Sequence, residues 1–127
     1  MTKTASHITK EAMAVYRATA RRQAQQEEEA LSQRLELARE TAQKAADLLR
    51  EQFSAKNVTL FGSVARGQGF HQRSDIDLAV DGIAHQDFWR AWSALDRIGT
   101  DFEFDLVDVE TASMDLIDQI RQEGIEL

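Results

Sequence analysis

Several features are missing from this sequence of 127 residues. It has no cysteine, which excludes disulfide bonds and metal sites built on thiolates. It has no proline, and its first glycine is Gly62, so residues 1–61 contain neither of the strong helix breakers. No apolar run is long enough to span a bilayer, and the N-terminus lacks the apolar core of a signal peptide. We therefore expect a cytoplasmic protein.

Negative charge is concentrated in the second half of the chain. The net charge is −7. Residues 1–53 hold nine Lys or Arg and eight Asp or Glu, whereas residues 54–127 hold six and fourteen. Such an acidic half repels a phosphate backbone, so we expect no direct binding of nucleic acid. The dense group of carboxylates is easier to explain if cations lie among some of its members.

Residues 1–53 form the first predicted region, a helical extension. Ala, Gln, Glu, Arg and Leu dominate residues 10–53, and all of them favour helix. Spacings of four and three residues mark one apolar stripe: Leu31, Leu35, Ala38, Ala42, Ala45 and Leu49. Polar residues 21–29 interrupt the pattern, which fits either one helix from about residue 8 to 53 or two helices joined near residues 22–29. Because the gap contains no Gly or Pro, we favour one continuous helix.

The N-terminal part of this helix has a second, shorter apolar patch formed by Ile8, Ala12, Val15 and Tyr16. Two interpretations remain open. An isolated helix gains little stability without packing, so the patch favours contact with a partner chain or a second copy of the protein. The alternative is a solvated, partly frayed extension.

Residues 54–127 have the pattern of a compact domain. Apolar and β-branched runs predict strands at 58–61, 76–80, 102–109 and 125–127. Helices are expected at 62–66, 85–98 and 111–123, and Gly99 and Gly124 end the last two. The residues expected to face the core from these two helices are Phe88, Trp89, Trp92, Leu95, Ile98, Met114, Ile117 and Ile120. This order predicts an α/β (α+β) fold in which helices flank a small mixed sheet.

Three aspartates are candidates for a metal site. Asp75 and Asp77 are two residues apart at a predicted strand, so their carboxylates project from the same face. Asp105 lies on the polar face of the third strand and joins them if the two strands are neighbours. Mg²⁺ prefers carboxylates together with substrate phosphates, and it would relieve the repulsion between them. Taken singly, each is also an ordinary solvated strand residue, which is what we expect of Asp108 and Glu110.

Gly62 and Ser63 follow the first strand and open a short helix. Glycine allows close approach of the backbone, and the serine hydroxyl and free N–H groups can then hold terminal phosphates. Arg66 is placed to steady the same phosphates. On its own, this is also the pattern of a serine that merely caps a helix.

Taken together, these pieces are more specific than any one of them. Gly62-Ser63-Val64-Ala65-Arg66-Gly67 is followed, after six residues, by Ser74-Asp75-Ile76-Asp77-Leu78, and later by Phe104-Asp105-Leu106-Val107-Asp108. Over roughly residues 55–127 this resembles the DNA polymerase β-like nucleotidyltransferase superfamily, and most of all its minimal (MNT) branch. The loop at residues 68–73 departs from that pattern, because it lacks the usual acidic residue and proline.

The resemblance implies a nucleotidyltransferase fold and chemistry with two metal ions. Asp75 and Asp77 would bind both Mg²⁺ ions, and Asp105 would bind the catalytic ion and help to deprotonate the attacking hydroxyl. ATP would be the nucleotide donor. The nucleotide-binding residues that we expect are Gly62, Ser63, Arg66 and Ser74.

The resemblance also implies a partner. Many minimal members are antitoxins encoded beside a HEPN-type RNase toxin, which implies AMP transfer from ATP to a toxin tyrosine. The extension at residues 1–53 would then dock the toxin or a second subunit, beside a transferase domain at residues 54–127. Two alternatives remain: an antitoxin that only binds and masks its toxin, and a transferase that modifies a small molecule such as an aminoglycoside.

Overall fold

A single long helix begins the computed structural model, which describes residues 8–127. α1 (Lys10–Phe53) runs without interruption for 44 residues, which confirms the prediction of one continuous helix. Thr9 caps its start, since Thr9 Oγ1 accepts the N–H of Ala12 at 3.1 Å. Residues 1–7 of the predicted extension lie outside the described residues.

The chain divides into two compact units between Gln33 and Arg34, within α1. The sequence predicts two regions of different composition with a boundary after residue 53, and that domain division stays a prediction. The difference arises from the C-terminal part of the apolar stripe, which belongs to the core of the second unit. Its fully buried members are Ala38, Ala42, Ala45 and Leu49.

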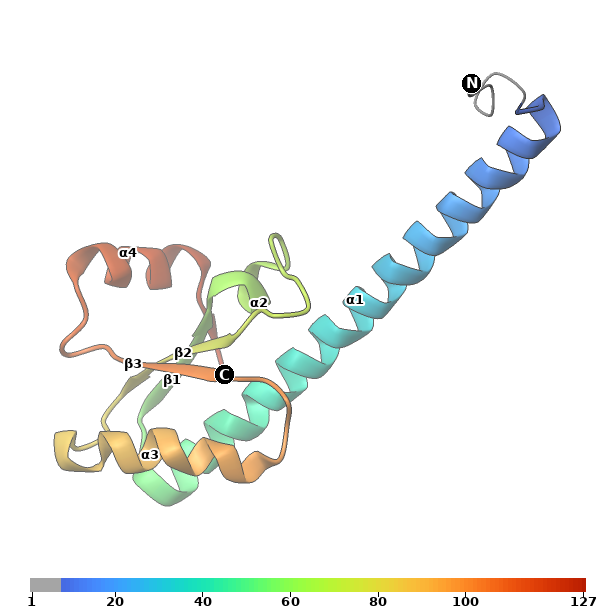
Figure 1. Ribbon diagram of the computed structural model, residues 1–127. Helices are drawn as coiled ribbons and strands as arrows, with labels where there is room; N and C mark the ends of the chain where they lie inside the picture. The colour runs from blue at the N-terminus through green and yellow to red at the C-terminus, as the bar shows by residue number, and fades with distance from the viewer. Residues whose placement is uncertain (1–7) are drawn as a thin grey trace, which may run out of the picture. The chain divides into compact units, whose positions relative to one another are not determined.

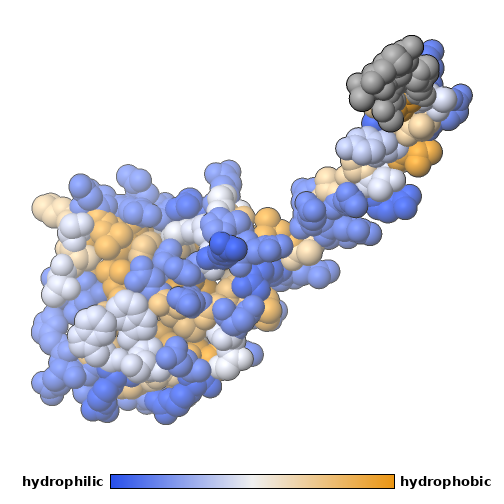
Figure 2. Space-filling view, viewed as in Figure 1, coloured by the Kyte–Doolittle hydropathy of each residue, from blue (hydrophilic) through white to orange (hydrophobic). Residues whose placement is uncertain are grey.

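The first unit is helical, and nearly all its described side chains are exposed. Val15 and Tyr16 are 66% and 70% exposed, and Ile8 is 50% exposed. In Figure 2, apolar residues break the hydrophilic surface near the N-terminal end of this helix. The apolar patch predicted here is therefore open to a partner. Among the described residues, no helix is both long and apolar enough to cross a membrane.

The second unit is built on a four-stranded mixed sheet (Figure 1). Its strands are β1 (Asn57–Phe61), β2 (Ile76–Asp81), β3 (Phe104–Asp108) and β4 (Ile125–Glu126). The order across the sheet is β3-β2-β1-β4. β1 pairs antiparallel with β2 and β4, whereas β2 pairs parallel with β3. The predicted mixed sheet, including its short final strand, is confirmed.

The predicted helix at residues 85–98 consists of three short pieces. They are a 3₁₀ turn (His85–Asp87), α3 (Phe88–Ala94) and a second 3₁₀ turn (Leu95–Ile98). This segment ends at Gly99 in a left-handed conformation, as predicted. The placement of Trp89 in the core was wrong, since 70% of it is exposed. Leu95 is fully buried as predicted, Ala91 and Ala94 are buried as well, and Trp89 stacks on Trp92.

Two further helices complete the unit, α2 (Gly62–Arg66) and α4 (Met114–Glu123). α4 starts later than predicted because Ser113 is its cap and accepts the N–H of Leu116. Met114 was expected in the core, but it stands in the first turn and is 83% exposed. Ile120 is buried as predicted.

The two faces of the sheet are covered by different helices. Figure 1 shows α3 and the C-terminal turns of α1 on one side of the sheet, and α2 and α4 on the other. Ile120 of α4 packs against Phe61 and Ala79. Because side chains alternate along a strand, Asp77 faces the same side as Ala79, toward α4. This alternation places the carboxylate of Asp77 on the α4 side of the sheet, against Gly62 at the start of α2.

Candidate active site

Two of the three predicted metal-binding aspartates lie side by side on neighbouring strands. β2 and β3 are parallel partners, and Asp77 pairs in register with Asp105. Asp75 immediately precedes β2 and is exposed, as is Asp105, whereas Asp77 is half-buried. The expectation that the second and third strands are neighbours is therefore confirmed.

Asp77 carries the clearest electrostatic sign of a functional site. Burial, followed by the negative charges of Asp105 and Asp75, raises its pKa from 3.8 to about 6. Glu123 adds to the rise in the pKa of Asp77, and Arg66 opposes it. The half-buried carboxylate of Asp77 is thus repelled by three neighbouring carboxylates. Such strongly perturbed carboxyl groups are concentrated at functional sites.

Gly62 brings the start of α2 into contact with this carboxylate. β1 runs directly into α2, and Gly62 adopts a left-handed conformation with φ of 75°. A β-carbon at this position would overlap Oδ2 of Asp77. Only glycine therefore allows the α2 backbone to lie against Asp77.

Glu123, which the sequence analysis did not single out, closes the site from α4. Its Oε1 accepts the N–H of Gly62 at 3.1 Å, and its Oε2 lies 2.6 Å from Nη1 of Arg66. Burial alone would raise the pKa of Glu123, but hydrogen bonds from Arg66, Gln119 and the Gly62 backbone outweigh it and lower the pKa below 4.5. Glu123 is therefore a charged member of the site.

The two predicted serines differ in their surroundings. Ser63 is half-buried within α2. Ser74 is buried, and its hydroxyl accepts the N–H of His71 at 2.9 Å. That bond orders the loop that leads into Asp75. The nucleotide-binding role of both serines stays a prediction.

A second group of polar side chains lies at the other end of β3. Nδ1 of His85 is 3.2 Å from Asp108, and Nε2 is 3.4 Å from Glu110. The expectation that Asp108 is solvated was wrong, because its side chain is only 12% exposed, beside His85. Within residues 8–127, this group brings three donor atoms within 4.8 Å of one another, which the three aspartates do not.

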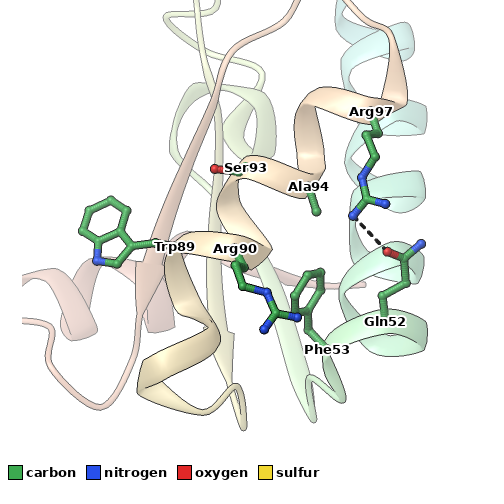
Figure 3. Close-up of a pocket in the computed structure, with 7 residues that line it drawn as sticks. All are labelled: Gln52, Phe53, Trp89, Arg90, Ser93, Ala94 and Arg97. Atoms are coloured by element: carbon green, nitrogen blue, oxygen red, sulfur yellow. Dashed lines mark hydrogen bonds between the residues drawn. The ribbon is translucent and has the colours of Figure 1, made fainter.

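One cavity along the second unit touches the predicted site, and another lies away from it. A cavity of about 460 Å³ is bordered by Ser74 and Asp75, together with Arg34 and Arg73. The cavity in Figure 3, of about 490 Å³, lies between the end of α1 and α3, and Arg97 donates a hydrogen bond to Gln52 there. None of the predicted site residues borders this second cavity.

The sequence of the second unit matches a known protein family. The model of the family described as polymerase beta, nucleotidyltransferase, matches residues 43–127. This chain is a member of the polymerase β nucleotidyltransferase family. The match begins inside the C-terminal part of α1 and includes every predicted site residue of the nucleotidyltransferase.

Solved structures narrow the relationship to the minimal branch. A chain of a toxin–antitoxin complex with AMP-PNP is 32% identical, with 67% of this nucleotidyltransferase and 70% of that chain covered and a TM-score of 0.56. A structure described as a minimal nucleotidyltransferase is 32% identical, with 73% and 95% covered and a TM-score of 0.58.

A third similar structure comes from Shewanella oneidensis. It contains a tri-AMPylated HEPN toxin in complex with an MNT antitoxin, and it is 28% identical, with 70% of each chain covered and a TM-score of 0.52. No protein with a curated description matches the chain. The minimal nucleotidyltransferase fold expected from the sequence is confirmed.

Proposed function

We propose that this protein is an antitoxin that transfers AMP from ATP to a tyrosine hydroxyl group of a cognate HEPN-type RNase toxin. The observation that carries the proposal is the pairing of Asp77 with Asp105 on adjacent strands, next to Asp75 and against Gly62. The membership of the family supports the transferase activity. The AMPylated toxin in the Shewanella oneidensis complex supports the choice of AMP and of a protein acceptor.

The donor chemistry of the site fits hard divalent cations. Asp75, Asp77 and Asp105 offer only carboxylate oxygens, which Mg²⁺ prefers. Burial and the neighbouring negative charges both raise the pKa of Asp77, and a bound cation would offset part of this cost of the ionised carboxylate. When bound, Mg²⁺ neutralises the charge that develops on the triphosphate and makes the acceptor hydroxyl more acidic.

The side chains of the protein have distinct roles in the proposed transfer. Asp105 accepts the proton of the acceptor hydroxyl, whose oxygen then attacks the α-phosphorus of ATP. The bond from that phosphorus to its bridging oxygen breaks, and pyrophosphate leaves. Gly62 and Ser63 hold the β- and γ-phosphates through the backbone N–H and the hydroxyl, while Arg66 balances their charge.

Toxin recognition belongs, in this proposal, to the helical extension. Its apolar residues Ile8, Val15 and Tyr16 are exposed and suit a protein partner. The alternative of a second copy of the chain on the same helix predicts a homodimer in the absence of toxin. Mass measurement of the purified protein, alone and with toxin, separates these two uses.

A neutralisation assay tests the proposed function in cells. The nucleotidyltransferase is expressed with its cognate toxin, either as wild type or with Asp75→Asn and Asp77→Asn together. We expect the double variant to bind the toxin but to lose protection, because it cannot hold the cations. Full protection by the folded double variant would instead support an antitoxin that acts by masking alone. Modification of an aminoglycoside but not of the toxin would support a small-molecule transferase.

A further inference from the structure

Glu123 contacts two groups that bind the triphosphate in the proposed function, the backbone N–H of Gly62 and the guanidinium of Arg66. Its Oε1 accepts the backbone N–H of Gly62 at 3.1 Å, and its Oε2 lies 2.6 Å from the guanidinium of Arg66. Gln119, one turn earlier on α4, donates to the same Oε1 at 2.7 Å. Glu123 thus presents a carboxylate to an N–H and a guanidinium that would otherwise face a phosphate.

The surroundings keep this carboxylate charged and in place. Only 13% of the Glu123 side chain is exposed, and its hydrogen bonds hold its pKa below the ordinary value. Its helix is fixed nearby, because Ile120 packs into the core against Phe61. A nucleotide would therefore displace the side chain by rotation rather than by moving α4.

We infer that Glu123 is a positioning residue that sets nucleotide affinity by competing, as an internal anion, for Gly62 and Arg66. The inference rests on the proposed function, since it requires these two residues to bind the triphosphate. In the free protein the carboxylate keeps Arg66 ordered at the site. When ATP binds, a phosphate replaces it, and part of the binding free energy is used to break the ion pair.

Replacement of the charge tests this inference. Glu123→Gln keeps the size of the side chain and an oxygen for Gly62, but removes the ion pair with Arg66. Without this charged competitor the Arg66 guanidinium is free for a phosphate, so we expect the Kd for AMP-PNP with Mg²⁺ to fall by about tenfold in isothermal titration calorimetry. Asp118→Asn is the matched control, because it removes the same charge from an exposed position of α4. Its Kd should equal that of wild type.

A double-mutant cycle separates competition from a general electrostatic effect. If Glu123 acts through Arg66, then Glu123→Gln should tighten binding much less when Arg66→Gln is already present. An equal gain in AMP-PNP affinity in both backgrounds would overturn the inference. The effect would then not depend on Arg66 and would come from the removal of repulsion between Glu123 and Asp77. Weaker AMP-PNP binding by Glu123→Gln, with a lower Tm, would overturn it as well, since Glu123 would then be only a structural tie.

The proposed function fails in a different way. If wild type, Asp118→Asn and Glu123→Gln all bind no AMP-PNP, the site is not a nucleotide site, and the inference falls with it. If wild type binds AMP-PNP and Glu123→Gln binds it no more tightly, only the role of Glu123 is overturned.

Discussion

At the scale of single residues, Asp77 makes the stability of the protein depend on pH. Its pKa is about 6 in the folded chain and 3.8 ordinarily. Between these pH values the folded state holds more protons than the unfolded state, so the free energy of unfolding falls as pH rises through this range. The ionised carboxylate is therefore a cost to the fold, and a bound cation would remove part of it.

Asp77→Asn should accordingly stabilise the protein while abolishing its activity. Without metal at pH 7.5, we expect the free energy of unfolding to rise by about 1 kcal/mol, because one pKa unit corresponds to about 1.4 kcal/mol and partial exposure reduces the full effect. Urea unfolding measures this, and the gain should disappear below about pH 4, where wild-type Asp77 is protonated as well. An unchanged or lower stability at pH 7.5 would contradict the cost of the ionised carboxylate described here.

Gly62 supports the site by having no side chain. Gly62→Ala places a β-carbon against Asp77, whereas Gly99→Ala has a similar φ of 74° and meets no atom within 4 Å. Both variants bear the conformational cost, so the extra loss in Gly62→Ala isolates the clash. We expect this extra loss to be about 1–3 kcal/mol in urea unfolding, with loss of AMP-PNP binding in Gly62→Ala alone. Equal losses in the two variants would show that α2 does not lie against Asp77.

At the scale of elements, α1 stabilises the sheet through its C-terminal part. Leu49 is fully buried, whereas Leu37 of the same helix is 48% exposed. Leu49→Ala should lower the free energy of unfolding by about 2–5 kcal/mol, because it leaves a cavity. Leu37→Ala should change it by less than about 0.5 kcal/mol. Similar effects of the two substitutions would mean that α1 is not packed into the second unit at Leu49.

Periodicity predicted the elements better than it predicted which face they bury. The continuous α1 and all four strands follow from local patterns, since helix breakers and β-branched runs act over a few residues. Trp89 and Met114 were misplaced because a helix wheel does not show which positions the sheet covers. Ala91 and Ala94 are buried in this segment, whereas Trp89 lies on its exposed side.

The same limit applies to the site. Asp75 and Asp77 share one short segment, so their spacing alone makes them candidates, and Asp105 becomes a candidate through the pairing of β2 with β3. Glu123 lies far along the chain from Gly62 and Arg66, and nothing local distinguishes it from the other acidic residues of α4. Only the packing of α4 over the sheet brings it to Arg66.

At the scale of the whole molecule, the division of α1 between two compact units predicts that they tolerate separation. Removal of residues 1–33 should leave Arg34–Leu127 folded, with a cooperative thermal transition and unchanged AMP-PNP affinity, because the predicted site lies entirely in the second unit. Toxin binding should weaken, since the extension is the proposed docking element. A truncated chain that fails to unfold cooperatively would contradict the independence of the second unit.

Transfer of AMP to the toxin is the central claim, and the mass of the toxin tests it most directly. Purified cognate toxin is incubated with ATP, Mg²⁺ and the nucleotidyltransferase, either as wild type or with Asp75→Asn and Asp77→Asn together. We predict that wild type increases the mass of the toxin by whole adenylyl groups on tyrosine and that the double variant leaves it unchanged. A toxin that is bound and inactivated by wild type without any gain in mass would contradict the account.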